Sequence, residues 1–153
     1  MDKQILQQYA DALARVKYIR ASIDKLSRKL EQMGSRGYCV SDSVTKGKKG
    51  KRTLGTAVVT GFPHREYGRA KLSLESKKKI LEEEELELLE LSSDVEEYIS
   101  GIKDIEVRNI MSLYYIDSLN WVQVAQRMNG MYGKKNYTDS SCRRKHDRFI
   151  EKN

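Results

Sequence analysis

Apolar residues in the first 33 positions recur at alternating steps of four and three residues. This spacing is typical of a coiled-coil seam, and it continues here over about four heptads. It predicts a helix over residues 1–33 whose apolar side must pack against another helix, and Gly34 ends the pattern. The seam residues are Ile5, Tyr9, Ala12, Val16, Ile19, Ile23, Leu26, Leu30 and Met33.

A second seam, with a seven-residue repeat, predicts an acidic coil helix over residues 72–103. Polar residues interrupt this seam near Lys77 and Glu84, whereas the first seam is complete. Because the first helix is basic, the two can pair within one chain or between chains. The complete first seam leads us to expect pairing between chains, in a homodimer or higher homo-oligomer. The repeat consists of Leu74, Leu81, Leu88, Val95 and Ile102.

The segment between these helices, residues 34–71, contains nine Lys or Arg against two acidic residues and is rich in glycine. This composition is typical of a solvated, basic linker. Residues 53–60 are compatible with one strand of a hairpin, followed by a turn over 62–64. The alternative to a passive linker is an arm that contacts nucleic-acid phosphates nonspecifically. The candidate contacts are Lys46, Lys48, Lys49, Lys51 and Arg52.

Three short helical patterns follow one another over residues 104–153, and each begins with a residue type that caps helix N-termini. In the second pattern, Asn120 and Gln123 are spaced as in a capping box. Two helices in tandem behind a supporting helix predict a helix-turn-helix domain. The N-caps are Asp104, Asn120 and Thr138, and the helices run from there to about Ile116, Met128 and Glu151.

The third helix decides what this domain can bind. If Cys142 and Phe149 face the core, a turn of about 100° per residue leaves an outer side that begins with hydroxyls and continues with arginines. Serine can bond base edges in the major groove, and arginine can bond guanine through two hydrogen bonds. The alternative is an ordinary solvated basic face. The predicted DNA-binding residues are Lys134, Lys135, Thr138, Ser140, Ser141, Arg143, Arg144 and Arg148.

Five short matches carry a resemblance to a known family. They are Arg108, Tyr114-Tyr115-Ile116, Leu119-Asn120-Trp121, Val124-Ala125 and Arg143-Arg144. On these residues the last third of the chain resembles small phage and prophage proteins of Gram-positive bacteria related to the RinA and ArpU late-gene transcription regulators. The C-terminus of those proteins resembles the promoter-reading fourth region of sigma factors. One departure is the connector over residues 129–137, because the turn of a typical helix-turn-helix has about 3–4 residues.

The fold class expected from the patterns and the resemblance is all-α. A long N-terminal coiled coil or helical hairpin comes first, and a sigma-region-four-like helix-turn-helix follows. A net charge of +7 is compatible with an acidic partner such as nucleic acid. The sequence has no apolar run of membrane-spanning length and no secretory signal pattern, so we expect a cytoplasmic protein that does not enter a membrane.

Catalytic chemistry is not indicated by any motif. The two cysteines and two histidines form no metal-binding pattern, since Cys142 and His146 would supply two ligands where a structural zinc site takes four. No Ser, Cys or His stands in a nucleophile motif. We therefore expect a protein that is not an enzyme and that carries no metal and no cofactor.

Three functions are compatible with these patterns. The resemblance favours a regulator that binds double-stranded DNA in a sequence-specific way and controls transcription, in phage-type proteins that of late genes. A phage DNA-packaging or recombination accessory protein would also use a helix-turn-helix on an oligomerising coil. The third function is a coiled-coil adaptor that contacts RNA polymerase or another protein, and the acidic helix is a candidate surface for a basic partner.

Overall fold

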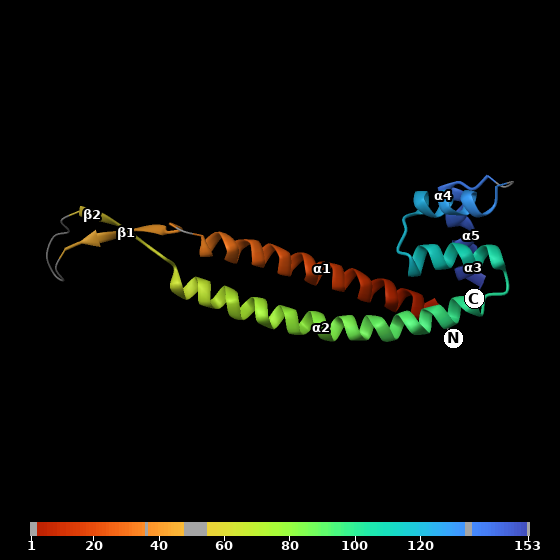
Figure 1. Ribbon diagram of the computed structural model, residues 1–153, viewed down its shortest axis with the longest axis horizontal. Helices are drawn as coiled ribbons and strands as arrows, with labels where there is room; N and C mark the ends of the chain where they lie inside the picture. The colour runs from red at the N-terminus through yellow and green to blue at the C-terminus, as the bar shows by residue number, and fades with distance from the viewer. Residues whose placement is uncertain (1–2, 36, 48–54, 134–135, 153) are drawn as a thin grey trace. The chain divides into compact units, whose positions relative to one another are not determined.

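The computed structural model is mostly helical, and it describes residues 3–35, 37–47, 55–133 and 136–152 (Figure 1). This confirms the broad helical character expected from the sequence. The structure is broadly consistent with the expected all-α class, and it contains a small two-stranded sheet in addition. The elements in chain order are α1 (Lys3–Gly34), β1 (Val40–Lys46), β2 (Gly55–Gly61), α2 (His64–Ser100), α3 (Ile105–Met111), the π-helix η1 (Ser112–Ile116), α4 (Trp121–Met131) and α5 (Asp139–Lys152).

The chain forms two compact units, and both long helices contribute to each of them. One unit contains residues 18–82, which are the second half of α1, the two strands and the first part of α2. The other contains residues 1–17 and 83–153, which are the start of α1, the end of α2 and all the shorter helices.

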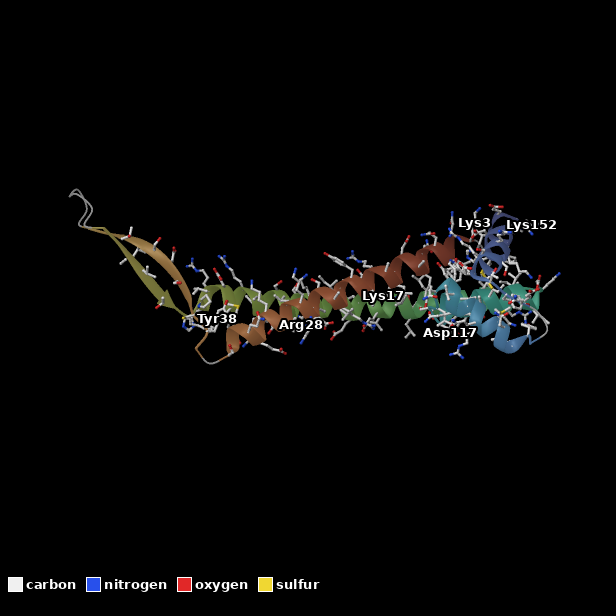
Figure 2. All side chains as sticks on the ribbon, turned by 90° about the horizontal axis from the view of Figure 1, so that it is seen from above. Lys3, Lys17, Arg28, Tyr38, Asp117 and Lys152 are labelled. Atoms are coloured by element: carbon white, nitrogen blue, oxygen red, sulfur yellow. The ribbon has the colours of Figure 1, made fainter. Side chains whose placement is uncertain are left out.

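In the unit of residues 18–82, α1 and α2 run antiparallel and side by side (Figures 1 and 2). The seam of α1 is buried here, as Ile19, Ile23, Leu30 and Met33 are each at most 9% exposed. Lys77, which interrupts the seam of α2, donates a hydrogen bond from Nζ to the Ser22 hydroxyl at 2.7 Å. The long lysine side chain can cover apolar surface while its ammonium group is satisfied by Ser22.

The described residues of the segment expected to be a linker include two strands and the first turns of α2. Strands β1 and β2 pair antiparallel, from Val40 opposite Gly61 to Lys46 opposite Gly55. Helix α2 then begins at His64, eight residues before the start at position 72 that the sequence suggested. Pro63 immediately precedes it and accepts a hydrogen bond from the Tyr67 N–H at 2.9 Å. A proline there has a fixed φ suited to a helix start, so it begins α2 rather than a turn.

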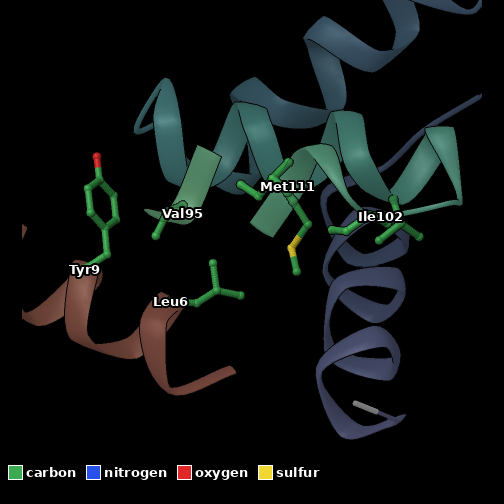
Figure 3. Packing of buried hydrophobic residues seen from close by; sticks show 7 residues of the cluster. Leu6, Tyr9, Val95, Ile102 and Met111 are labelled. Atoms are coloured by element: carbon green, nitrogen blue, oxygen red, sulfur yellow. The ribbon is translucent and has the colours of Figure 1, made fainter. Parts of the chain in front are cut away.

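In the unit of residues 1–17 and 83–153, the start of α1 runs antiparallel to the end of α2 (Figure 1), and Figure 3 shows Leu6 of α1 facing the core that contains Val95 and Met111. Glu84, the second polar interruption of the α2 seam, forms an ion pair with Arg15 of α1. Phe149 and Ile150 of α5 pack against the same core. The buried residues of this first core cluster are Leu6, Tyr9, Val95, Ile99, Ile102, Val107 and Met111.

Burial of the α1 seam within one chain bears directly on the expected oligomer. Pairing between chains is expected because the first seam is complete whereas polar residues interrupt the second. Within each unit the seam residues are buried or half-buried against the same chain, and Val16 is 1% exposed. The two seams therefore pack against each other within one chain, because Lys77 and Glu84 have partners on α1, and pairing between chains stays a prediction.

A second core cluster joins α3, η1, α4 and α5, and it consists of Ile110, Leu113, Val124, Ala125, Met128, Tyr137 and Cys142. The predicted caps are confirmed. The Asp104 carboxylate accepts from the N–H groups of Glu106 and Val107, and Asn120 and Gln123 form a reciprocal capping box. The first helical pattern does end at Ile116, but its last turn is a π-helix, in which the Asp117 N–H bonds the Ser112 carbonyl at 3.1 Å.

Among the residues that the structure describes, no helix combines the length and the apolar character that crossing a membrane requires.

Candidate nucleic-acid interface

Helix α5 begins at a cap that occupies two of the predicted contact residues. The Thr138 hydroxyl accepts from the Ser141 N–H at 3.2 Å, and the Ser141 hydroxyl accepts from the Thr138 N–H at 3.0 Å. The Ser141 hydroxyl also donates to the Thr138 carbonyl at 2.9 Å. Both hydroxyls are therefore used to start the helix, and Ser141 is half-buried. Their local role is to fix where α5 begins.

The buried and exposed sides of α5 lie where the sequence placed them. Cys142 is fully buried, and burial raises the pKa of its thiol. Ser140, Arg144 and Arg148 are exposed at successive turns of the opposite side. Among the described residues, neither Arg144 nor Arg148 has an ion-pair partner. Two guanidinium groups are thus available to an external anion on one side of one helix.

Arg143 differs from the other two arginines because it has a partner on its own helix. Its Nε lies 3.8 Å from a carboxylate oxygen of Asp147, four residues later, and both side chains are more than half exposed. Exposed pairs of this kind stabilise by only about 0.3–0.5 kcal/mol. An incoming phosphate can replace this contact at little cost.

His146 connects α5 to η1 and α4 through a cluster of rings. Its Nε2 lies 3.0 Å from the Tyr115 hydroxyl, and its Nδ1 lies 2.9 Å from a carboxylate oxygen of Asp147. Its ring contacts Trp121, which stacks on Tyr114 with ring centroids 4.1 Å apart. Burial raises the pKa of Tyr115 to about 12. The cluster holds the inner side of α5, so His146 lies at the edge of the core.

The connector between α4 and α5 is closed by a side chain. The Asn129 amide donates to the Tyr137 carbonyl at 2.9 Å and accepts from the Tyr137 N–H at 2.6 Å. Asn109 of α3 also donates to the Tyr132 hydroxyl at 2.8 Å. The longer connector is therefore held at both of its ends. The predicted contacts Lys134 and Lys135 lie outside the described residues.

Lys145 holds α5 against α3, a role that the sequence analysis did not assign. Its ammonium group forms an ion pair with Glu106 and lies 5.8 Å from the centroid of the Tyr137 ring. Burial raises the pKa of Tyr137, and the nearby Glu106 carboxylate raises it further. The only sequence signal was that Lys145 lies between the outer and inner sides of the helix, where a long side chain can reach a neighbouring element.

The remaining predicted contacts belong to the basic segment that joins the two long helices. Lys48, Lys49, Lys51 and Arg52 lie outside the described residues, as does the side chain of Lys46. In the described parts of the chain, no group of three or more His, Cys, Asp or Glu is placed to hold a metal ion. The exposed guanidinium groups of Arg144 and Arg148 are suited to binding an anion through hydrogen bonds and charge.

Comparisons with protein-family models, with curated proteins and with solved structures found no match to this chain.

Proposed function

We propose that α4 and α5 form a helix-turn-helix that binds double-stranded DNA, and that the protein regulates transcription in the manner of the phage late-gene regulators it resembles. The observation that carries this proposal is the outer side of α5, where Ser140, Arg144 and Arg148 are exposed. A recognition helix presents its first turns to base edges and its later residues to phosphates. Ser140 and Arg144 match the first role by position, and Arg148 matches the second.

The way α5 is held supports the same proposal. DNA reading requires a helix whose orientation is set before binding, because loosely held side chains lose much of their discrimination. On α5, Lys145 is bound to Glu106, His146 to Tyr115, and the preceding connector to Asn129. These contacts use the inner side only. The orientation of Arg144 and Arg148 is therefore set by the rest of the domain before DNA binds.

The charge of the whole chain supports DNA over a neutral partner. A net charge of +7 draws the protein towards a polyanion, and it does so independently of base sequence. The acidic residues are concentrated in the second half of α2, where Ile80 to Ile102 includes no Lys or Arg. That surface would be repelled by phosphates, so DNA should approach the α5 side rather than α2.

The deciding experiment is selection of bound sequences from a random duplex library, followed by footprinting of the selected sequence on phage or prophage DNA. We expect a discrete protected site at a promoter of late genes. A repeat at a packaging or recombination site would replace regulation by a DNA-packaging or recombination role. Absence of any selected sequence would favour an adaptor that contacts RNA polymerase or another protein through the same helices.

A further inference from the structure

The two-stranded ribbon is an unusual feature of the unit of residues 18–82. Its strands have seven residues each, and Figure 2 shows the ribbon extending beyond the ends of α1 and α2 with side chains on both of its faces. Val58 is 72% exposed and Val59 54% exposed, although they occupy adjacent positions and so point to opposite faces. An isolated two-stranded hairpin is only marginally stable in water. A ribbon that projects in this way is suited to binding a partner.

The register divides the ribbon into two chemically different faces. One face, called the apolar face below, carries Val40, Val44, Ala57 and Val59, together with the carboxylate of Asp42 opposite Val59. The other is the hydroxyl face, which carries Ser41, Ser43, Thr56, Val58 and Thr60. Ser41 lies directly opposite Thr60, and Ser43 lies directly opposite Val58. All five side chains of the hydroxyl face are exposed.

Charge and shape indicate the occupant of the hydroxyl face. Residues 34–71 contain nine Lys or Arg against two acidic residues, so this unit attracts a polyanion. Arg65 and Arg69 are exposed in the first turns of α2, just after the ribbon. The major groove of B-DNA admits a two-stranded β-ribbon as well as an α-helix. In that groove serine and threonine hydroxyls can bond base edges, and an apolar side chain can contact the methyl group of thymine.

We propose that the ribbon of β1 and β2 is a second DNA-binding element, which enters the major groove with its hydroxyl face towards the bases. This inference rests on the proposed function, namely that the chain binds duplex DNA, and it adds a contact separate from α5. Arg65 and Arg69 bind phosphates beside the groove. The residues between the two strands, 48–54, lie outside the described part of the chain and form no part of this site.

The test is chemical footprinting with dimethyl sulfate, which reads guanine N7 in the major groove and adenine N3 in the minor groove. The probe is a duplex that carries the selected site at its centre and mixed sequence on both sides. The ribbon variant is S41A/S43A/T60V, which removes three hydroxyls from one face. Its matched control is V44T/V59T, which changes the apolar face and keeps β-branched residues. Amide chemical shifts of the strands verify that both variants keep the ribbon.

We expect the full-length protein to protect two separate tracts of guanine N7. The ribbon variant should lose one tract and bind roughly tenfold more weakly, because hydroxyl contacts to the bases are lost. The control should protect both tracts with unchanged affinity. Two tracts that persist in the ribbon variant would overturn the inference, and so would a second tract found only at adenine N3. If only the control V44T/V59T binds DNA more weakly, and its sedimentation shows a smaller species than the wild type, the apolar face instead joins two copies of the chain. That outcome would overturn the inference.

Failure of this inference can be separated from failure of the proposed function by testing R144A on the same duplex. If R144A removes one tract while the ribbon variant removes none, the ribbon inference fails and the α5 proposal stands. If the ribbon variant removes the only tract and R144A has no effect, α5 is not the reading helix and the ribbon inference stands. Absence of any protection on the duplex overturns both.

Discussion

Asn129 and the backbone of Tyr137 form a pair of hydrogen bonds that closes the connector between α4 and α5. The amide of Asn129 donates at 2.9 Å and accepts at 2.6 Å, as a backbone group would in a strand pair. The connector is longer than the turn of a typical helix-turn-helix, which is about 3–4 residues. Because both groups of Tyr137 are bound at once, the residue that leads into α5 is fixed against α4. The longer connector is therefore compatible with a set angle between the two helices.

The first prediction concerns this pair. N129A removes the acceptor and the donor, and it leaves two partly buried backbone groups of Tyr137 unsatisfied. We expect a loss of about 2–3 kcal/mol in the free energy of unfolding, measured in urea. N129D keeps the acceptor but places a carboxylate oxygen against the Tyr137 carbonyl, so it should also lower the stability. Q126A, at an exposed position of the same helix, is the control and should change the stability by less than about 0.5 kcal/mol. Equal effects of N129A and Q126A would show that the pair contributes nothing.

The second prediction concerns base reading by α5. R144A should weaken binding to the selected site by about 1–3 kcal/mol and relax the preference at one base position. R148A should weaken binding to selected and random duplexes alike, since a phosphate contact carries no sequence information. Both positions are exposed, so thermal unfolding should be unchanged. If both variants lose affinity equally on all duplexes and keep the same base preference, α5 makes only an electrostatic contact with DNA.

The third prediction concerns the basic run between the strands. Replacing Lys46, Lys48, Lys49, Lys51 and Arg52 with Gln should weaken binding about equally on all DNA sequences. The dependence of the binding constant on salt should also become less steep, because fewer counterions are released. Fluorescence anisotropy over a salt series measures both effects. If the affinity and its dependence on salt are both unchanged, the basic run does not contact DNA and is only a spacer.

The fourth prediction concerns stability at alkaline pH. The pKa of Tyr115 is raised by burial to about 12, above the ordinary value of 10.0, so the folded state holds this proton more tightly than the unfolded state. The stabilisation is complete below about pH 10 and is lost as the pH rises through about 12. Its upper magnitude is about 2–3 kcal/mol. Urea unfolding at a series of alkaline pH values should therefore show falling stability.

The variant Y115F provides the matching comparison. It cannot ionise, so its stability should fall less steeply with rising pH, although it also loses the contact with His146. Y18F changes a tyrosine that is 74% exposed and should follow the wild-type curve. Parallel curves for all three proteins would show that Tyr115 ionises at its ordinary pKa in the folded state.

The fifth prediction concerns the oligomeric state in the absence of DNA. Because the α1 seam is buried within the chain, sedimentation at micromolar concentration should give a species of 17.7 kDa. V16D would then destabilise the monomer, since Val16 is 1% exposed and a buried carboxylate is costly. A stable dimer in sedimentation would restore the pairing between chains that the complete seam first suggested.

Several features of this protein were determined by local sequence alone. The spacing of apolar residues along the sequence predicts two long helices, each with one apolar side that must pack against another surface. The caps at Asp104, Asn120 and Thr138 are satisfied by groups within three residues of each cap. The exposed side of α5 follows from the angle per residue once Cys142 is placed inside. These features could be predicted because each depends on groups that are close in the sequence.

Other features were decided only by the tertiary structure. The start of α2 before position 72 was missed because Pro63 and the glycines look like breakers until the hairpin brings the chain back to α1. The ribbon was only partly anticipated, since its exposed strands lack the apolar alternation of a half-buried sheet. Lys145 gained its role from Glu106, a distant residue on another helix. In each case the outcome depended on which surfaces meet.

The coiled-coil seams show the physical reason most directly. Lys77 and Glu84 appear in the sequence as interruptions that weaken the pairing of α2 with α1. In the fold they bind Ser22 and Arg15, which lie 55 and 69 residues away in the chain. The cost of a polar group in an apolar seam depends on whether a partner reaches it, and spacing along the sequence carries no information on that. The sequence therefore determined that two seams exist, and only the tertiary structure decided that they close on each other.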